Sequence, residues 1–503
     1  MKEFKMIRLS TLNIKEIERK GHWKYNDPEI TGVETSSLRI EKGYIFVAKH
    51  SKTKTSHGAI FSNQAFKKGA SLIITDLEGY EYAVTKGFNS DIPFLLVENV
   101  ELTLGNILEN IYPDKPKFIM GVTGTNGKTS VVNFSQQLIE QKNKSCVTIG
   151  TLGVDGVLSL RTENTTPDQT FIFRILQMAK SKGANYALLE VSSHSIVQRR
   201  INGVVFKVFC FTNLSQDHLD YHNDMETYFQ SKLSVLDTLS SNTKIIVNID
   251  DKYGELFYEK AKSLGFQIET IGFSEKANVK LRAHQDTSDI QSVEIIKDGL
   301  LHRFKTLLIG KFQAINLGMA LLTCETFGFE FAEIVNYCNL LKPVPGRLEF
   351  VGKTKTGASI YIDFAHTPDG LKHLLQTLRA LTKGDLILVF GAGGERDKDK
   401  RKPMGTIAHK YCDLIYVTDD NPRHEHAAGI RKQIIKGCPG AIEIADRSEA
   451  ITIAINKANY DDIVVIAGKG HEQVQVVKNN YFPFSDFEQA STAIALMDQI
   501  THG

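Results

Sequence analysis

The residues best suited to chemistry stand in the segment GVTGTNGKTS, at positions 121–130. A strand pattern, FIMGVT, precedes this glycine-bearing loop, and a helical pattern follows it. In such a loop the backbone N–H groups face phosphate oxygens, and the helix dipole adds to the attraction. We expect Lys128 to reach the β and γ phosphates of a nucleotide and the Thr129 hydroxyl to bind Mg²⁺. The loop is a variant, because Val122 stands where the usual spacing has a glycine.

Two later strand patterns also end in residues that could take part in this chemistry. Glu190 closes the run YALLE, where a carboxylate beside a phosphate loop is well placed to hold Mg²⁺. The segment FTNLSQDHLDYH, at 211–222, offers Asp217 and His218. A lone histidine in a loop is as often solvated as it is a ligand, and a neutral imidazole suits zinc better than Mg²⁺.

The elements that must position these residues fall into three regions, which we expect to be domains spanning residues 1–115, 116–343 and 344–503. The first mixes short strand and helix patterns and ends near the two prolines of YPDKPK. The other two alternate β-branched runs with helical patterns, as parallel strands buried on both faces do. In the third region each strand pattern ends in Gly, Asp, His or Asn, and doubly wound sheets bind ligands at that edge. The sequence therefore predicts an α/β fold.

The bulk composition excludes several other classes of protein. The 503 residues are 42% hydrophobic and 23% charged, as in ordinary globular proteins. The chain has 60 Lys and Arg and 58 Asp and Glu, which gives a formal net charge of +2. This near balance gives no reason to expect a nucleic-acid or membrane-surface partner. No two of the six cysteines lie within four residues of each other, so we expect buried, reduced thiols. The chain shows neither a signal-peptide pattern nor an apolar run of about 18 residues, and we expect a cytoplasmic protein.

The spelling TGTNGKT resembles the ATP site of the Mur ligases and of the related folylpolyglutamate synthetases. Further motifs that look like those of the Mur ligases follow in family order: TTPD, EVSSHSIVQRR, TNLSQDHLDYH, YFQSKLSVL, GRLEF, DFAHTPDG, GAGGERDKDKRKPMG, DDNPR and GKGHE. Together they cover nearly all of residues 117–490. The resemblance implies an N-terminal uridine-binding-like α/β domain, a central P-loop ATPase-like parallel sheet and a C-terminal Rossmann-like domain.

The same resemblance implies an activity and its reactants. The family's enzymes are ATP-dependent ligases of peptidoglycan synthesis. They phosphorylate the carboxylate of a UDP-linked precursor and let the amine of an amino acid attack the resulting acyl phosphate. We expect UDP-N-acetylmuramoyl dipeptide, ATP and meso-diaminopimelate as substrates, Mg²⁺ as cofactor, and a monomer. Two metal ions, the lysine of the phosphate loop and the loop amides would stabilise the transferring phosphoryl group.

The family's functional residues carry over onto matching positions of this chain. The catalytic residues would be Lys128, Glu190, His218 and Lys232, and the metal ligands Thr129, Glu190, His218 and Lys232. Lys232 would act as a carbamate, because a lysine that has taken up CO₂ is an anion able to hold a second Mg²⁺. ATP would be bound by Gly124, Thr125, Asn126, Gly127, Lys128, Thr129, Ser130, Asn316 and Arg347. The UDP-linked substrate would be bound by Ser37, Thr165, Thr166, Ser192, Gln198 and Arg200.

The choice of amino acid is implied by the motif DNPR, which in the family marks enzymes that add meso-diaminopimelate. This amino acid differs from lysine by a carboxylate at its far end, and Arg423 could bind that group through two parallel hydrogen bonds. Lysine would leave the guanidinium unpaired, which gives strong discrimination. The amino-acid site would comprise Arg396, Asp420, Asn421, Pro422, Arg423, Gly468 and Glu472.

The N-terminal region departs from the family pattern. Where a D-S-R triplet is usual, this chain has Ser36, Ser37 and Leu38, and His57-Gly58-Ala59 replaces the usual D-G-H. The contacts to uridine or the diphosphate must therefore differ, with Arg39 one candidate for compensation.

Three alternatives remain open on the sequence. The chain could be a related ligase that adds L-lysine or another amino acid, or glutamate to a folate. It could be a P-loop ATPase or kinase with no carboxylate acceptor. It could also be a nucleotide-binding scaffold without catalysis, although Lys128, Thr129 and Glu190 are all present.

Overall fold

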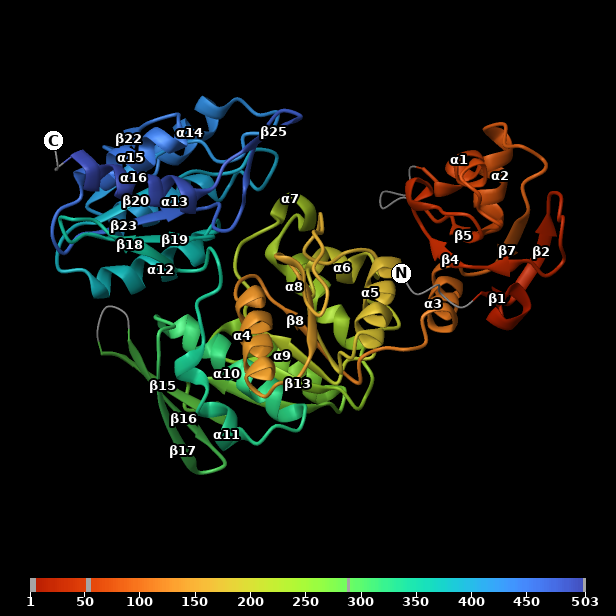
Figure 1. The fold of residues 1–503 in the computed structure, drawn as a ribbon, viewed down its shortest axis with the longest axis horizontal. Coiled ribbons are helices and arrows are strands. Elements are labelled where there is room, and N and C mark those ends of the chain that lie inside the picture. Colours follow the sequence, from red (N-terminus) through yellow and green to blue (C-terminus); the bar gives the residue numbers. More distant parts are fainter. Residues whose placement is uncertain (1–5, 51–55, 287–289, 501–503) are drawn as a thin grey trace. The chain divides into compact units, whose positions relative to one another are not determined.

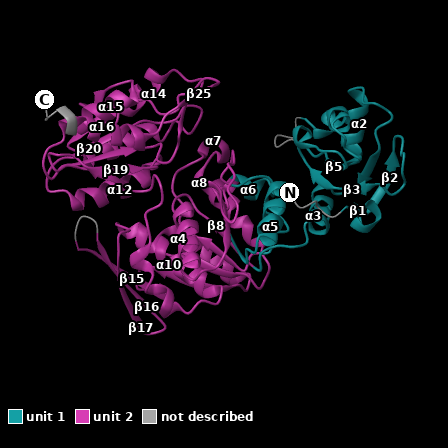
Figure 2. Ribbon diagram, viewed as in Figure 1, with its two compact units in different colours: residues 1–117, 166–187, 194–205 teal, residues 118–165, 188–193, 206–503 magenta. Residues whose placement is uncertain are grey.

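The computed structural model describes residues 6–50, 56–286 and 290–500. The chain divides into two compact units, which Figure 2 shows in different colours. Unit 1 comprises residues 1–117, 166–187 and 194–205, and unit 2 comprises residues 118–165, 188–193 and 206–503. Both units combine helices with sheets rich in parallel strands, so the predicted α/β class is confirmed (Figure 1).

Unit 1 is built on a five-stranded sheet with the order β2-β7-β6-β5-β4. Strands β4 to β7 are parallel, and β2 runs antiparallel to β7 at one edge. The strands of unit 1 are β1 (Ile7–Arg8), β2 (Glu16–Lys20), β3 (Glu29–Ile30), β4 (Gly32–Glu34), β5 (Tyr44–Val47), β6 (Leu72–Thr75) and β7 (Phe94–Val97). Its helices include η1 (Leu9–Leu12), η2 (Ser37–Arg39), η3 (Gly58–Phe61), α1 (Ser62–Lys67), α2 (Leu77–Thr85), α3 (Val100–Ile111) and α5 (Gln169–Ser181). All four residues of β5, β6 and β7 are buried, as expected for strands covered on both faces.

The larger sheet of unit 2 has ten strands in the order β10-β9-β11-β8-β12-β13-β14-β15-β16-β17. The strands are β8 (Phe118–Thr123), β9 (Cys146–Gly150), β10 (Gly153–Gly156), β11 (Tyr186–Glu190), β12 (Val208–Phe211), β13 (Lys244–Asn248), β14 (Gln267–Gly272), β15 (Val279–Gln285), β16 (Gln291–Lys297) and β17 (Leu300–Thr306). Strands β8, β12, β13 and β14 are parallel, as their buried β-branched sequences predict. The antiparallel extension formed by β15, β16 and β17 was not predicted.

The order of these strands positions the candidate site. Strand β8 lies between β11 and β12, so the loop that follows β8 is flanked by the ends of two neighbours. One of these ends carries Glu190, and the other leads into Thr212 and Asn213. The helices of unit 2 in this part of the chain are α4 (Lys128–Gln141), α7 (Leu219–His222), α8 (Met225–Leu233), η4 (Ser234–Thr238), α9 (Lys252–Ser263), α10 (Lys311–Thr326), α11 (Phe331–Val335) and η5 (Cys338–Leu340), whereas α6 (Ser193–Val197) lies mostly in unit 1.

A second sheet of unit 2 has the order β18-β19-β23-β20-β21-β22. Strand β18 (Glu349–Lys353) is antiparallel to its neighbour β19. The other five strands are parallel to one another: β19 (Ser359–Asp363), β20 (Leu386–Phe390), β21 (Leu414–Val417), β22 (Ile442–Glu443) and β23 (Ile463–Ala467). The residues of β20 alternate between two apolar cores, because successive side chains of a strand point to opposite faces. One core includes residues of α12 (Pro368–Leu381), α13 (Arg401–Tyr411) and α14 (Ala427–Ile435); the other includes residues of α15 (Arg447–Lys457) and α16 (Asp486–Ile500). A hairpin of β24 (Val474–Val477) and β25 (Asn480–Pro483) completes the unit.

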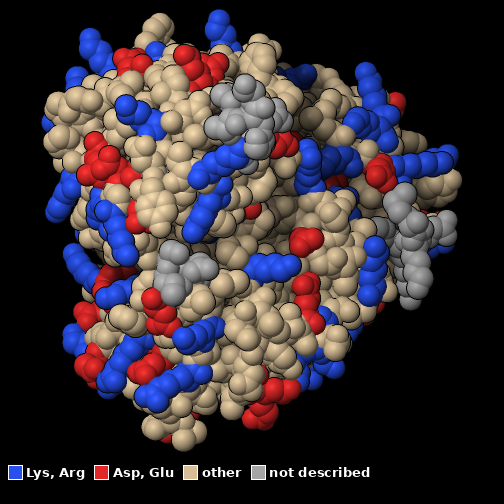
Figure 3. Space-filling model, turned by 60° about the vertical axis from the view of Figure 1, so that its left-hand side comes forward, with Lys and Arg blue, Asp and Glu red and all other residues tan. Residues whose placement is uncertain are grey.

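The surface agrees with the nearly balanced charge of the sequence. Basic and acidic side chains are interspersed over the face shown in Figure 3. Over the described part of the chain, none of the helices is both long and apolar enough to cross a bilayer.

Candidate active site

Two glycines of the phosphate loop are required by its backbone. Gly124 has φ +149°, and a Cβ there would stand 1.9 Å from Thr212 Oγ1. Gly127, the N-cap of α4, has φ +89°, and a Cβ there would stand 2.5 Å from Asn316 Oδ1. Any larger residue would therefore be strained and would collide with its neighbour.

The loop is held by Asn213, which follows β12. Its backbone oxygen accepts the Thr125 N–H at 2.9 Å, and its Oδ1 accepts the Asn126 N–H at 3.0 Å. Lys128 Nζ donates to the backbone oxygens of Gly124 and Thr125 at 2.8 and 2.9 Å. Burial lowers the pKa of Lys128, and Glu190 opposes that effect. A cation thus lies within the loop, where nucleotide phosphates would be bound.

Glu190 lies at the centre of a hydrogen-bonded group beside the loop. Its Oε2 accepts from Thr129 Oγ1 at 3.1 Å and from Thr151 Oγ1 at 3.0 Å, while its Oε1 accepts the Thr151 N–H at 2.8 Å. Arg347 Nη2 donates to Thr129 Oγ1 at 3.3 Å. Glu190 is only 1% exposed. Hydroxyl and carboxylate oxygens are the hard donors that Mg²⁺ prefers, so this donor set fits that ion.

Lys232 is buried against the same loop, with 1% of its surface exposed. Its Nζ donates to Gly124 O at 3.1 Å and lies 4.7 Å from the centroid of the Tyr228 ring. Burial first, and then the nearby Lys128 charge, hold the pKa of Lys232 well below 10.5, against the opposing effect of Asp217. A lowered pKa increases the share of the neutral amine, which is the form that reacts with CO₂ to give a carbamate.

A cavity of about 470 Å³ begins at the loop, where Asn126, Gly127 and Ser130 line it. Asn316 and Arg347 also line it, together with the apolar side chains Leu214, Phe273, Phe312, Ile315 and Leu374. Its size is typical of a small-molecule site. This lining, which combines the phosphate loop with polar and apolar side chains, suits a nucleotide.

A second cavity, of about 950 Å³, connects the two sheets of unit 2. Thr129, Thr151 and Glu190 line one part of it, and His471 and Glu472 line another. The carboxylate beside the phosphate loop and the motif GKGHE therefore face one common space. Burial first, and then Arg347, lower the pKa of His471 to about 4, so this imidazole is neutral near pH 7.

The motifs DNPR and GKGHE form one polar cluster. Asn421 Nδ2 donates to Glu472 Oε2 at 2.8 Å, and Lys469 Nζ donates to Asn421 Oδ1 at 3.0 Å and to Glu472 Oε2 at 2.9 Å. Arg423 has φ +52°, and its Nη1 donates to Gly394 O at 2.7 Å. The backbone thus turns sharply at Arg423, and its guanidinium is held against the loop that follows β20.

The other residues expected at the amino-acid site lie around this cluster. Arg396 is exposed, and its charge adds to burial, the larger cause, in lowering the pKa of Arg423. Asp420 is buried and accepts the Asn421 N–H at 2.6 Å. Gly468 has φ +113°, and a Cβ there would lie 2.9 Å from Asp420 Oδ2. Pro422 is buried between Asn421 and Arg423.

The residues expected to bind the UDP-linked substrate are divided between the units. Ser37, Thr166, Gln198 and Arg200 belong to unit 1, whereas Thr165 and Ser192 belong to unit 2. In unit 1, Arg200 donates to the Thr166 oxygen and to Gln198 Oε1, the latter through Nη2 at 2.6 Å.

Two residues in and beside the altered N-terminal triplet, Ser37 and Arg39, also have local partners. Ser37 Oγ donates to Gln64 Oε1 at 2.7 Å. Arg39 Nη2 lies 2.6 Å from Asp168 Oδ2 and 3.1 Å from Glu34 Oε2. Arg39 is thus engaged by two carboxylates within unit 1.

Sequence reasoning missed two groups of residues. It selected Gly468 and Glu472 but not Lys469, which is fully buried between them and which the quoted motif GKGHE contains. It also left Asp217 without a role, although His218 and His366 lie 3.4 and 3.5 Å from its Oδ2.

Asp217 lies among basic side chains. Its Oδ1 is 3.5 Å from Lys400 Nζ. Burial opposes its charge, but the His366 hydrogen bond, followed by His218 and Lys400, holds the pKa of Asp217 well below its usual range. His218, a predicted metal ligand, is thus paired with an ionised carboxylate.

Comparison with known proteins gives matches along most of the chain. The family model described as the Mur ligase middle domain matches residues 122–324. The model of the Mur ligase glutamate ligase domain matches residues 346–470. A UDP-N-acetylmuramoyl-L-alanyl-D-glutamate--2,6-diaminopimelate ligase of Brucella melitensis is 37% identical over 470 residues, covering 93% of this chain and 94% of that protein.

Solved structures of Mur ligases have the same fold as this chain. A structure of a UDP-N-acetylmuramoyl-L-alanyl-D-glutamate--2,6-diaminopimelate ligase superimposes with a TM-score of 0.69 and 28% identity, covering 98% of this chain and all of the other. The MurF ligase of Thermotoga maritima in complex with ADP has a TM-score of 0.64 and 17% identity, covering 94% of this chain and 98% of the other, which supports the fold alone.

Proposed function

The chain belongs to the Mur ligase family, and from this premise we propose that it adds meso-diaminopimelate to UDP-N-acetylmuramoyl-L-alanyl-D-glutamate. It is an ATP-dependent ligase of peptidoglycan synthesis that forms an amide bond and releases ADP and phosphate. One observation carries the proposal: Glu190 and Glu472 line the same cavity. A phosphorylated carboxyl group and an attacking amine can meet only if such a common space exists.

The reaction proceeds by activation of the precursor's carboxylate. An O⁻ group is a poor leaving group, so the carboxylate first attacks the γ-phosphate of ATP and becomes an acyl phosphate. The amine of the incoming amino acid then attacks the carbonyl carbon, and phosphate leaves. Lys128 and the N–H groups of the loop stabilise the charge on the transferring phosphoryl group. Asn316 and Arg347, which line the nucleotide cavity, position ATP.

Metal ions complete this site in our proposal. Thr129, Glu190 and His218 would hold Mg²⁺, and Lys232 as a carbamate would supply a further anionic ligand. Bound Mg²⁺ supplies positive charge to the phosphate oxygens. The lowered pKa of Lys232 supports the carbamate, because the neutral amine is the form that captures CO₂.

The amino acid binds at the cluster of DNPR and GKGHE. Arg423 pairs with the distal carboxylate of diaminopimelate, and Asn421 and Glu472 bind its distal amino and carboxyl groups. Arg396 binds the proximal carboxylate. Arg423 keeps further N–H groups on the guanidinium besides the one given to Gly394, which leaves donors for a carboxylate.

The test is a phosphate-release assay on the purified chain with UDP-N-acetylmuramoyl-L-alanyl-D-glutamate, ATP and Mg²⁺. Each amino acid is supplied in turn, and the lengthened peptide is identified by mass. We expect turnover with meso-diaminopimelate and little with L-lysine. Activity with L-lysine or with glutamate on a folate, and none with diaminopimelate, would reject the proposal. The expectations of a cytoplasmic location and a monomer rest on the sequence.

A further inference from the structure

A group of titratable side chains lies in unit 1, and one of its members, His57, belongs to the triplet that replaces the family's D-G-H. His50 follows β5 and Asp76 directly follows β6, and these two strands are parallel neighbours. His57 is joined to His50 by an isolated antiparallel bridge and precedes η3. The carboxyl ends of adjacent parallel strands therefore bring His50 and Asp76 together, at the edge where α/β sheets bind ligands.

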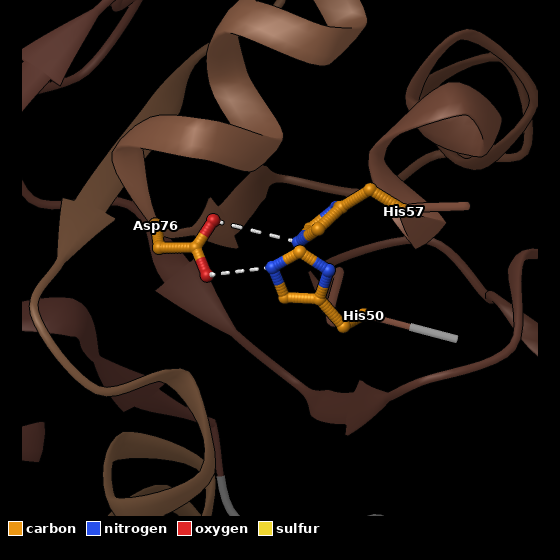
Figure 4. Close-up of side chains that lie close together, drawn as sticks. All are labelled: His50, His57 and Asp76. Atoms are coloured by element: carbon orange, nitrogen blue, oxygen red, sulfur yellow. Dashed lines mark ion pairs between the residues drawn. The ribbon is translucent and has the colours of Figure 1, made fainter. Parts of the chain in front are cut away.

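The three side chains converge on one point, as Figure 4 shows. His57 Nε2 lies 3.4 Å from Asp76 Oδ1, and His50 Nε2 lies 3.9 Å from Asp76 Oδ2. One potential ligand atom from each residue lies within 4.8 Å of the others. A tetrahedral ion with bonds of about 2.0–2.1 Å holds its ligand atoms about 3.3 Å apart. The two separations between histidine and aspartate, 3.4 and 3.9 Å, are thus close to those of a shared ion.

A buried, unsatisfied atom points to a ligand here. His57 is 3% exposed, and its Nε2 makes no hydrogen bond to any of the described residues. Buried polar atoms nearly always have a hydrogen-bond partner, and a bound ion is one recognised explanation for an exception.

We propose that His50, His57 and Asp76 bind one divalent ion of the zinc class. Two imidazole nitrogens and a carboxylate select Zn²⁺ or a similar transition metal over Mg²⁺, which prefers oxygen donors alone. Glu78 supplies a fourth ligand, because its Oε2 lies 3.2 Å from His50 Nε2 and its side chain is free to adjust, being 76% exposed. The ion ties the end of β5 to the end of β6.

Binding has one identifiable local cost. The Ala59 N–H donates to His57 Nδ1 at 3.1 Å, so Nε2 carries the proton in the neutral ring. Coordination through Nε2 moves that proton to Nδ1 and breaks the hydrogen bond to Ala59. Without a metal, His57 and Asp76 form an ordinary ion pair, and the hydrogen bond from Ala59 to His57 is retained.

The experiment uses the full chain after treatment with a chelator, in saturating Mg²⁺ so that the proposed catalytic metal site is occupied. Co²⁺ is added as a spectroscopic substitute for Zn²⁺. We expect one equivalent to bind with the intense visible absorption of a tetrahedral site, and Zn²⁺ to displace it. Asp76→Asn and His50→Ala should each weaken binding by about 10–100-fold or more. In the native chain Asp76 Oδ1 accepts the Gly79 N–H at 2.7 Å and so caps α2. The side-chain oxygen of asparagine can accept the same hydrogen bond, so Asp76→Asn retains this cap.

Two controls separate this site from others. His409→Ala removes an exposed histidine elsewhere and should bind Co²⁺ as the native chain does. His218→Ala removes a proposed catalytic ligand, and it too should leave this binding intact. Zn²⁺ should raise the melting temperature of the native chain but not that of Asp76→Asn. Absence of stoichiometric binding, equal binding by Asp76→Asn, or loss of binding in His218→Ala would each overturn the proposal, without bearing on the ligase activity.

Discussion

Lys469 Nζ and Glu472 Oε2 lie 2.9 Å apart, and this ion pair fixes a carboxylate of the proposed amino-acid site. Lys469 is 0% exposed, whereas the Glu472 side chain retains 33% of its exposure. The same ammonium donates to Asn421 Oδ1 and to Val474 O at 3.0 and 2.8 Å. With three acceptors, the buried charge of Lys469 is fully satisfied, so the lysine links GKGHE to DNPR.

Lys469→Met should therefore lower both stability and substrate affinity. Breaking a buried pair usually costs 3–5 kcal/mol, and partial exposure of Glu472 reduces this to roughly 1–3 kcal/mol. Urea unfolding measures this loss, and steady-state kinetics should show a higher KM for diaminopimelate. Lys457→Met is the control, because Lys457 is an exposed lysine at the end of α15. It should change neither the free energy of unfolding nor the KM for diaminopimelate. An unchanged KM in Lys469→Met would show that Glu472 needs no such support.

Arg423→Lys should reduce discrimination between diaminopimelate and L-lysine. An ammonium is a point charge and cannot form the paired hydrogen bonds of a guanidinium with a carboxylate. We expect kcat/KM for meso-diaminopimelate to fall by about 10²-fold or more, with little change for L-lysine. The ratio of the two values is the measurement. If both substrates lose activity equally, Arg423 acts on the fold of the site and not on the choice of substrate.

Lys128→Ala should abolish ATP-dependent phosphate release while the chain stays folded. Removal of one preorganised donor to transition-state charge typically costs 10²–10³-fold in kcat, and this residue also binds the ground-state phosphates, so a loss of about 10³-fold or more is expected. Phosphate release and circular dichroism are measured together. Lys144→Ala, an exposed lysine beyond the same helix, should retain native activity.

Lys232 should couple activity to CO₂. Activity should fall in CO₂-depleted buffer and return on addition of bicarbonate, and ¹³C-bicarbonate should give a carbamate resonance that is missing in Lys232→Arg. A native-like resonance in Lys232→Arg would assign the carbamate to another amine.

The lowered pKa of Lys232 also predicts a pH dependence in CO₂-free protein. Between that lowered pKa and 10.5, the unfolded chain holds a proton on this lysine that the folded chain lacks. The contribution of Lys232 to the free energy of unfolding therefore rises with pH across this window. Comparing the pH dependence of unfolding in the native chain and in Lys232→Met isolates this contribution.

Much of the fold could be predicted because local sequence specifies it. Buried parallel strands such as β12 and β20 are continuous apolar runs, and the glycines of the phosphate loop are demanded by a backbone that no other residue adopts easily. The antiparallel strands β15 to β17 were not predicted, although β15, VKLRAHQ, alternates apolar and polar residues as a half-buried strand does. The last strand, β17, LLHRFKT, mixes apolar and charged residues without a clear pattern.

The sequence by itself determined the chemistry available to this protein: a phosphate loop with Lys128, a carboxylate at the end of a neighbouring strand, and an arginine in DNPR. Only the tertiary structure decided which distant residues share a site. Asp217 meets His366, and Lys469 meets Asn421, across separations of 149 and 48 residues. These pairings follow from strand order and sheet packing, which bring strand ends together in space and leave no periodic trace along the chain.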